Sequence, residues 1–198
     1  MRAKEIARGA EAIVYEARPA GIKVLLKVRA QKEYRASALD VQLRSSRTKR
    51  EARIMARAMA NGIRVPALIG VSQYSICMER VDGRLMKDAR MSAAMVSGAG
   101  RILGALHNAG ISHGDFTPAN IIVERSGALC VIDFGLSDMT YGDEERALDI
   151  LLMKRQISKA LYGSFIRSYS RTAKAGRGAI RRLVHIEERG RYQPRAPA

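Results

Sequence analysis

Two short motifs limit what this chain can fold into more than any other feature. The first, His113-Gly-Asp-Phe-Thr-Pro-Ala-Asn120, places an Asp and an Asn five positions apart in one loop. The second, Val131-Ile-Asp-Phe-Gly135, ends an apolar segment with an Asp that precedes Phe-Gly. Phosphoryl transfer from ATP needs one carboxylate to orient the nucleophile, and an amide and a second carboxylate to hold magnesium on the phosphates. The pair of motifs, in this order, predicts that chemistry.

The length and composition fit a small folded protein. The chain has 198 residues, of which 47% are hydrophobic and 27% are charged, so one compact domain or two small lobes around a cleft can form a packed core. No apolar run approaches the roughly 20 residues that a membrane span requires, and the N-terminus has no apolar signal region. We therefore expect a cytoplasmic protein that is not in a membrane. Cys77 and Cys130 lie in apolar, strand-like runs and are expected to be buried free thiols.

The formal net charge of +16 is the strongest compositional signal. It exceeds the net charge of about 2–8 that solubility alone favours in a small domain. An anionic macromolecule, above all a nucleic acid, is the partner that such an excess indicates. The alternative is a solvated basic surface that serves only solubility.

The N-terminal portion is predicted to be rich in strands. Alternating and apolar segments predict strands at 4–17 (a hairpin), 22–28, 67–71 and 74–79. A helix is expected at 45–60, after an irregular segment at 34–44, and Asn61-Gly62 is a signal that ends it. Residues 81–83 are expected to form a turn.

The C-terminal portion is predicted to be mainly helical. Helices are expected at 92–109, capped by Ser92, and at 143–159, and a strand pair at 121–124 and 129–132. The remainder, 163–198, is expected to be partly helical and strongly basic. These patterns predict an α+β fold with an N-terminal lobe at 1–80 and a C-terminal lobe at 81–198.

Lys27 and Glu51 are candidates for an ion pair in the N-terminal lobe. A strand lysine facing a cleft can contact the α- and β-phosphates of ATP, and it needs a carboxylate to fix its direction. Glu51 lies on the following helix, where it can serve this purpose. The alternative is that both are ordinary surface residues. Gly9 and Ala10, in Arg8-Gly-Ala-Glu-Ala12, could let backbone N–H groups approach phosphate, although a simple hairpin turn explains them nearly as well.

The two opening motifs supply the remaining candidates. Asp115 is expected to orient or deprotonate the nucleophile, and Asn120 and Asp133 to bind Mg²⁺ through oxygen atoms. His113 is expected to support the loop backbone rather than act as a base. Asp149 lies in an apolar helix, so its carboxylate needs hydrogen-bond donors, and the backbone of the 113–120 loop could provide them.

With these residues in place, the chain resembles the protein-kinase superfamily, and in particular its small atypical branch, the kinase subunit of the KEOPS (EKC) complex. The similar segments include residues 9–15, 32–40, 47–51, 63–66, 78–83, 113–120, 132–137 and 189–191. The resemblance implies a two-lobed, minimal kinase-like fold in which the backbone of Glu79 and Val81 meets adenine. Gly114 stands where ordinary protein kinases carry an Arg, and no Ala-Pro-Glu follows the short segment after Gly135. The activation segment that would hold a peptide substrate is therefore expected to be missing.

The resemblance also implies a biological setting. Such subunits act largely as ATPases, together with a threonylcarbamoyl transferase subunit and other KEOPS subunits, in making threonylcarbamoyladenosine in tRNA. The basic segment from Arg167 to Arg195 independently suits a phosphate backbone, and its alternative is a solvated helix face. Two other readings remain open: a RIO-type or small-molecule kinase, and an RNA-binding scaffold that keeps the fold without catalysis.

Overall fold

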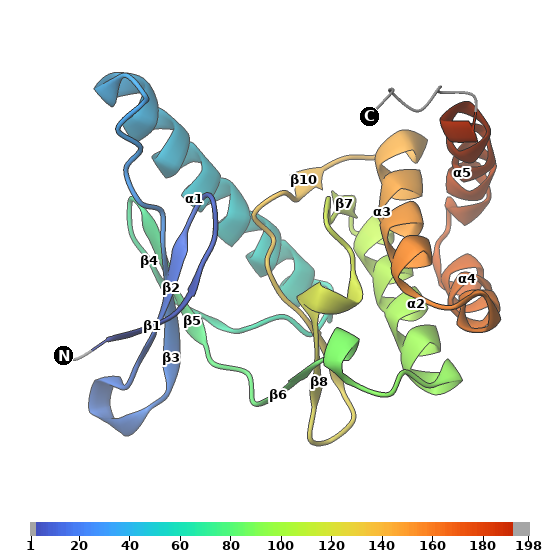
Figure 1. The fold of residues 1–198 in the computed structure, drawn as a ribbon, viewed down its shortest axis with the longest axis horizontal. Coiled ribbons are helices and arrows are strands. Elements are labelled where there is room, and N and C mark those ends of the chain that lie inside the picture. Colours follow the sequence, from blue (N-terminus) through green and yellow to red (C-terminus); the bar gives the residue numbers. More distant parts are fainter. Residues whose placement is uncertain (1–2, 192–198) are drawn as a thin grey trace, which may run out of the picture. The chain divides into compact units, whose positions relative to one another are not determined.

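The computed structural model describes residues 3–191 (Figure 1). Contacts divide the chain into two compact units: Met1–Arg84 with Ile122–Leu136, and Leu85–Ile121 with Ser137–Ala198. Among the described residues, no helix is both long and apolar enough to cross a membrane.

The first unit contains a five-stranded antiparallel sheet. Its strand order is β1-β2-β3-β5-β4, and the strands are β1 (Lys4–Arg8), β2 (Ile13–Ala17), β3 (Val24–Val28), β4 (Leu68–Val71) and β5 (Ser75–Glu79). A short 3-10 turn, Pro19–Gly21, links β2 to β3. The predicted hairpin and the predicted β4–β5 pair are confirmed. The central place of β3 puts Lys27 between two hydrogen-bonded neighbours, opposite Val14 and Ile76.

The helix of this unit is longer than the sequence predicted. α1 runs from Ser37 to Ala60, so the expectation of an irregular segment at 34–44 is wrong for most of its length. Polar residues of this segment stabilise the first turns of the helix. The buried Asp40 carboxylate accepts a hydrogen bond from Arg44 at 2.6 Å and another from the Lys32 backbone N–H at 3.3 Å. The predicted end is confirmed, since Gly62 has φ +73° after the C-cap residue Asn61.

A second, smaller sheet explains where the units divide. It has the order β6-β8-β9, with β6 at Gly83–Leu85, β8 at Ile121–Glu124 and β9 at Leu129–Val131. Gly83 therefore begins a strand instead of closing a turn, and a Cβ atom there would lie 2.4 Å from the Val123 carbonyl oxygen. The Arg64 carbonyl accepts a hydrogen bond from the Val131 N–H. Because of these contacts, 122–136 belongs to the first unit, whereas the expected lobes at 1–80 and 81–198 assigned it to the second.

The second unit is built mainly of helices. They are α2 (Ala93–Asn108), α3 (Asp143–Gln156), α4 (Lys159–Thr172) and α5 (Gly176–Arg191), with 3-10 turns at Met86–Asp88 and Pro118–Asn120. A two-stranded ladder joins β7 (Ile111–Ser112) to β10 (Asp138–Met139). α2 packs against α4, and α3 against α5, around a core that includes Leu103, Phe165 and Tyr169.

Helix boundaries in this unit follow local capping. Ser92 caps α2 by accepting a hydrogen bond from the Met95 N–H, as predicted. The helix expected at 143–159 is confirmed as α3 but ends three residues earlier, at Gln156, because Ile157 is extended; Ser158 then caps α4 through the Leu161 N–H. Both cysteines are free thiols; Cys130 is buried as predicted, whereas Cys77 is only half-buried.

Candidate active site

Lys27 is held between carboxylates in the first unit. Its Nζ atom lies 2.6 Å from Glu51 Oε1 and 2.7 Å from Asp133 Oδ1, which confirms the predicted Lys27–Glu51 ion pair. The Lys27 side chain is 12% exposed and that of Glu51 only 2%. Burial alone would lower the pKa of Lys27, but the negative charges of Glu51 and Asp133 outweigh it and raise the pKa above its ordinary value. Lys27 is thus a permanent positive charge with a fixed direction.

Arg29 is a member of this cluster that the sequence reasoning missed. Its guanidinium is buried and lies 2.6 Å from Glu51 Oε2, so each oxygen of Glu51 binds one cation. Arg29 directly follows β3, and its N–H donates to the Tyr74 carbonyl at 2.9 Å, so the strand pairing continues to it. Residues two apart in such a segment face the same side of a sheet. That rule could have identified Arg29 as a neighbour of Lys27 once β3 was placed.

Asp133 lies on the segment that follows β9. Its backbone has φ +60°, a left-handed conformation that is uncommon for residues other than glycine. Its Oδ1 atom also accepts a hydrogen bond from the Gly135 N–H at 3.3 Å, and the side chain is 55% exposed. Asp133 therefore places its carboxylate beside Lys27, and its uncommon backbone conformation is of a kind found often at functional sites.

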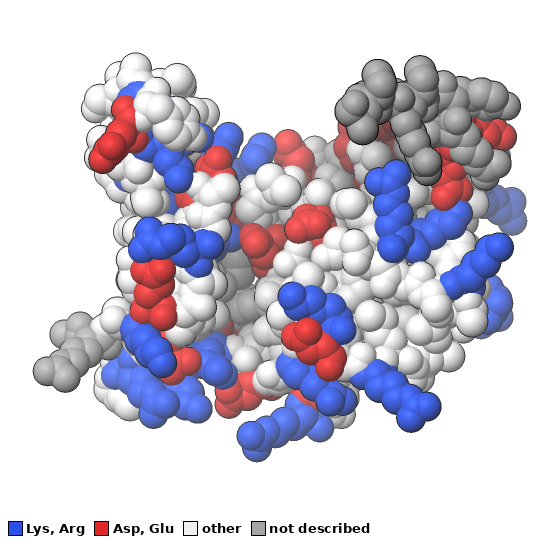
Figure 2. Space-filling view, viewed as in Figure 1, with Lys and Arg blue, Asp and Glu red and all other residues white. Residues whose placement is uncertain are grey.

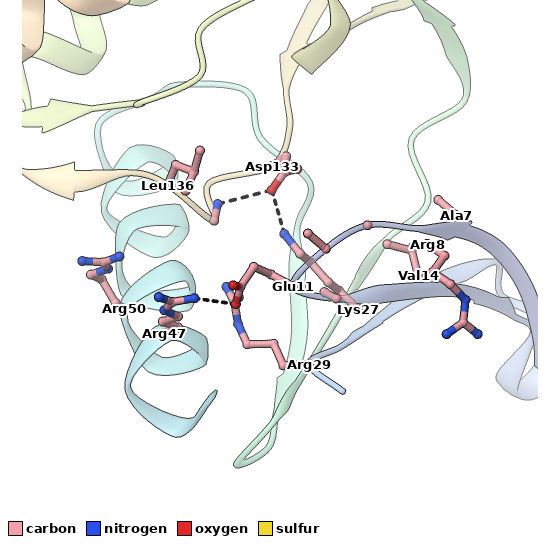
Figure 3. Close-up of a pocket in the computed structure, with 14 residues that line it drawn as sticks. Ala7, Arg8, Glu11, Val14, Lys27, Arg29, Arg47, Arg50, Asp133 and Leu136 are labelled. Atoms are coloured by element: carbon pink, nitrogen blue, oxygen red, sulfur yellow. Dashed lines mark hydrogen bonds and ion pairs between the residues drawn. The ribbon is translucent and has the colours of Figure 1, made fainter. Parts of the chain in front are cut away.

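A pocket of about 670 Å³ surrounds these groups (Figure 3). All of its lining residues belong to the first unit. Gly9 and Ala10 line it through the β1–β2 turn, which the Gly9 N–H closes by donating to the Ala12 carbonyl at 2.9 Å. Seven of the other lining residues carry charged side chains: Arg8, Glu11, Lys27, Arg29, Arg47, Arg50 and Asp133. Cations outnumber carboxylates on this wall, which suits an anionic ligand.

Glu79 and Val81 stand at the end of β5, where adenine was expected to bind. The Glu79 N–H donates to the Ala67 carbonyl at 2.9 Å, so that group is already used within the sheet. The Glu79 carboxylate accepts two hydrogen bonds from Arg64, each of 2.7 Å, and Arg64 also binds Glu124 at 2.8 Å. These bonds fix the end of β5 against the β8–β9 hairpin. An adenine-binding role for Glu79 and Val81 stays a prediction.

In the second unit, Asp115 and Asn120 lie together on one loop. Asn120 Nδ2 donates to the Asp115 carboxylate at 2.7 Å and to the Asp115 carbonyl at 2.9 Å. With its nitrogen so engaged, the amide offers its oxygen as the remaining ligand atom. Both side chains are partly exposed. His113 supports the loop as expected, because its Nδ1 atom accepts the Asp115 N–H at 3.3 Å.

The fully buried Asp149 supports the same loop from α3. Its two oxygens accept the backbone N–H groups of His113 at 2.7 Å and Gly114 at 2.8 Å, the supporting role that the sequence suggested. Gly114 has φ +78°, so a larger residue there would be strained. Asp149 also lies 3.2 Å from His107 Nε2, and His107 Nδ1 lies 2.9 Å from the Tyr169 hydroxyl.

Basic residues are spread over both units. Figure 2 shows Lys and Arg side chains distributed over the visible face of each unit, with carboxylates among them. On α4, α5 and the segment between them, exposed cations include Arg167, Arg171, Lys174, Arg177, Arg181 and Arg189. Others are neutralised by ion pairs, as Arg182 is by Glu144. The last part of the predicted basic tail, 192–198 with Arg195, lies outside the described residues.

Comparison with protein families gives one domain match. A family model described as the RIO domain matches residues 16–172. A probable bifunctional tRNA threonylcarbamoyladenosine biosynthesis protein of Methanothermobacter thermautotrophicus is 37% identical, covering 94% of this chain and 36% of the relative. The chain thus spans about a third of the length of that bifunctional protein.

Two further relatives match over nearly their whole length. The KEOPS complex subunit Bud32 of Pyrococcus abyssi is 36% identical and 98% of each chain is covered. The EKC/KEOPS complex subunit BUD32 of Encephalitozoon cuniculi is 33% identical, covering 93% of each chain.

Solved structures with a similar fold include a kinase and a phosphotransferase. The Rio2 kinase–ADP/Mg²⁺–phosphoaspartate complex of Chaetomium thermophilum has a TM-score of 0.69 at 17% identity, covering 97% of this chain and 71% of that one. Macrolide 2′-phosphotransferase MphH of Brachybacterium faecium has a TM-score of 0.67 at 14% identity, covering 96% and 83%. These likenesses confirm the predicted α+β, kinase-like fold.

Proposed function

Since this chain belongs to the RIO-domain family, in the branch of the Bud32 subunits of KEOPS complexes, we propose that it is an atypical serine/threonine protein kinase and ATPase. It uses Mg-ATP in support of threonylcarbamoyladenosine modification of tRNA. The family membership corrects one contrast drawn from the sequence, which set RIO-type kinases against the KEOPS branch. Both descriptions apply to relatives of this chain.

The observation that carries the proposal is the cluster of Lys27, Glu51 and Asp133, in which Lys27 and Asp133 line the pocket of the first unit and the buried Glu51 binds Lys27. A buried lysine kept charged by two carboxylates is suited to binding phosphate oxygens. The Gly9–Ala12 turn lines the same pocket and brings backbone near the ligand. We assign Lys27 to the phosphates, Glu51 to holding Lys27 in place, and Gly9 and Ala10 to the phosphate loop.

The donor atoms present fit Mg²⁺. Magnesium prefers oxygen ligands and is usually held by one or two carboxylates, with substrate phosphates and water completing its shell. Asp133 presents an exposed carboxylate, and the nitrogen of Asn120 is engaged so that its oxygen remains for a ligand. The described residues contain no cluster of three or more His, Cys, Asp or Glu suited to a metal. When bound, the ion would neutralise charge on the phosphates.

We assign Asp115 to orienting the nucleophile and accepting its proton. The nucleophile is water in ATP hydrolysis and a Ser or Thr hydroxyl in protein phosphorylation. The hydrogen bond from Asn120 and the support of the loop by Asp149 hold the Asp115 backbone and carboxylate in one arrangement. The two units are assigned to one reaction because the 113–120 and 131–135 motifs follow one another in the order that is typical of kinases.

The proposed partners are other KEOPS subunits, in particular the threonylcarbamoyl transferase subunit, and tRNA. The names of the Pyrococcus and Encephalitozoon relatives support a KEOPS assembly. The bifunctional relatives, of which this chain spans about a third, support a second function acting with the kinase part. The exposed cations of α4 and α5 and the net charge of +16 support binding of the RNA backbone.

Single-turnover hydrolysis of ATP by the purified chain tests the proposal. Phosphate release and phosphoryl transfer to protein would be measured with and without tRNA and the transferase subunit. Asp133→Ala should lose activity in every condition in which the wild type is active, while Asp88→Ala, which removes an exposed acid, should retain it. Equal inactivity of the wild type and Asp133→Ala under all conditions would favour the catalytically silent RNA-binding scaffold.

A further inference from the structure

The turn between β1 and β2 is tied to α1 by an ion pair. Glu11 lies in the turn, and its carboxylate accepts a short hydrogen bond from Arg47 on α1. A second cation, Arg35, approaches the same carboxylate at 3.4 Å. Glu11 and Arg47 both line the pocket, and Figure 3 shows their contact beside Lys27. The turn is therefore not a free hairpin tip.

Arg47 shares α1 with the carboxylate that holds Lys27. Arg47 and Glu51 are four residues apart, so they project from the same face of the helix. Glu51 fixes the lysine, and Arg47 fixes the turn. One rigid helix thereby sets the position of both walls that a phosphate chain would contact.

The composition of the turn explains why such a tie is useful. Phosphate loops rich in glycine place backbone N–H groups close to phosphate because they lack side chains and adopt many conformations. This turn has a single glycine, Gly9, between Arg8 and Ala10. A less adaptable turn needs another interaction to hold its backbone at the position where it can contact phosphate. The Glu11–Arg47 pair is placed to provide that interaction.

We infer that Glu11 and Arg47 are positioning residues for nucleotide phosphates: their ion pair holds the Gly9–Ala12 turn over Lys27. The inference rests on the proposed function and concerns two side chains to which that function assigns no part. The positioning role and simple electrostatics predict opposite effects of removing Glu11. By charge alone, Glu11 repels an anionic nucleotide, so its removal would strengthen binding; as a positioning residue, its removal weakens binding.

Charge substitutions separate these two effects. Glu11→Gln and Arg47→Gln change the charge of the pocket in opposite directions, and both break the pair. We expect each to raise the Kd for Mg-ATP, and the KM, on the order of 5-fold, as for the loss of a partly exposed ion pair, with kcat little changed. The double variant Glu11→Arg/Arg47→Glu keeps the net charge and should recover most of the lost affinity. Glu33→Gln removes an exposed acid that does not line the pocket and should bind as wild type.

The measurement is titration of each purified variant with Mg-ATP, with unfolding midpoints recorded alongside. Tighter binding by Glu11→Gln, or no recovery in the double variant, would overturn the inference, as would equal affinity of Glu11→Gln and wild type. Absence of saturable Mg-ATP binding by the wild type would instead refute the proposed function. The two failures are therefore distinguishable.

Discussion

The carboxylate of Asp149 accepts a hydrogen bond of 2.8 Å from the backbone N–H of Gly114, which lies 35 positions earlier in the chain. The other carboxylate oxygen accepts the His113 N–H. Asp149 is fully buried, so water cannot replace these bonds if they are lost. The conformation of the loop that carries Asp115 therefore depends on one side chain of α3.

Asp149→Asn should destabilise the second unit by about 3 kcal/mol, because an amide can accept only through its oxygen and presents N–H groups to backbone donors. Asp88→Asn, at an exposed position of the same unit, should change the free energy of unfolding little. Urea unfolding monitored by circular dichroism measures both. A loss for Asp149→Asn no larger than that for Asp88→Asn would show that the loop finds other acceptors.

Glu51→Gln should destabilise the first unit more than Lys27→Met does. Glu51 binds two cations, Lys27 and Arg29, so its neutralisation leaves both without their shared charge partner, at a cost of about 3 kcal/mol or more. Lys27→Met leaves Glu51 with Arg29. We expect both variants to lose ATP turnover, so only their free energies of unfolding distinguish them. The opposite order of unfolding midpoints would contradict the shared role of Glu51.

Two glycines in helices should respond to alanine with opposite signs. A Cβ atom on Gly100 of α2 would lie 2.3 Å from the Phe165 carbonyl oxygen of α4, whereas one on Gly163 meets only the end of the Arg167 side chain. Gly100→Ala should therefore destabilise by about 1–3 kcal/mol through overpacking. Gly163→Ala should stabilise by about 1 kcal/mol through helix propensity. Thermal unfolding of the two variants checks the signs, and stabilisation by Gly100→Ala would mean that α2 and α4 separate easily.

Acid should weaken the contact of Arg64 with Glu79. The hydrogen bonds from Arg64 hold the pKa of Glu79 below its ordinary value, so its contribution to stability is present above the unfolded-state pKa and is lost as pH falls through the folded-state value. From pH 5 downward, the wild type should lose stability more steeply than Glu79→Gln. Urea unfolding at several pH values measures the difference, with the exposed Glu33→Gln as a control. Parallel pH profiles for wild type and Glu79→Gln would argue against this linkage.

What the sequence could predict was set by local chemistry. Asn61-Gly62 and Ser92 identified helix ends because capping depends on residues close in the chain. The Lys27–Glu51 pair followed from the kinase-like motifs. The start of α1 was missed because its N-cap residue, Ala36, has no capping side chain. The Arg64 contacts that place 122–136 in the first unit were missed because they join residues far apart in the chain. The end of α3 was predicted three residues too late, because Ile157 lies four residues after Met153 and continues the apolar spacing but is extended. The roles of Asp115, Asn120 and Asp133 stay predictions.

The exposed cations of α5 should contribute to RNA binding through charge alone. Arg177 and Arg181 are exposed, while Ala179 and Leu183 of the same helix face the core. Arg177→Gln/Arg181→Gln should therefore fold normally and bind tRNA more weakly, lowering the slope of log affinity against log salt by about 1–2, since each phosphate contact releases a counterion. Removal of 190–198 should act in the same direction, with a larger loss at low salt than at high salt. Filter binding of tRNA at several salt concentrations measures both, with Arg182→Gln, whose guanidinium already pairs with Glu144, as a control. An unchanged salt slope in both the double variant and the truncation would show that these cations form a solvated helix face and do not contact RNA.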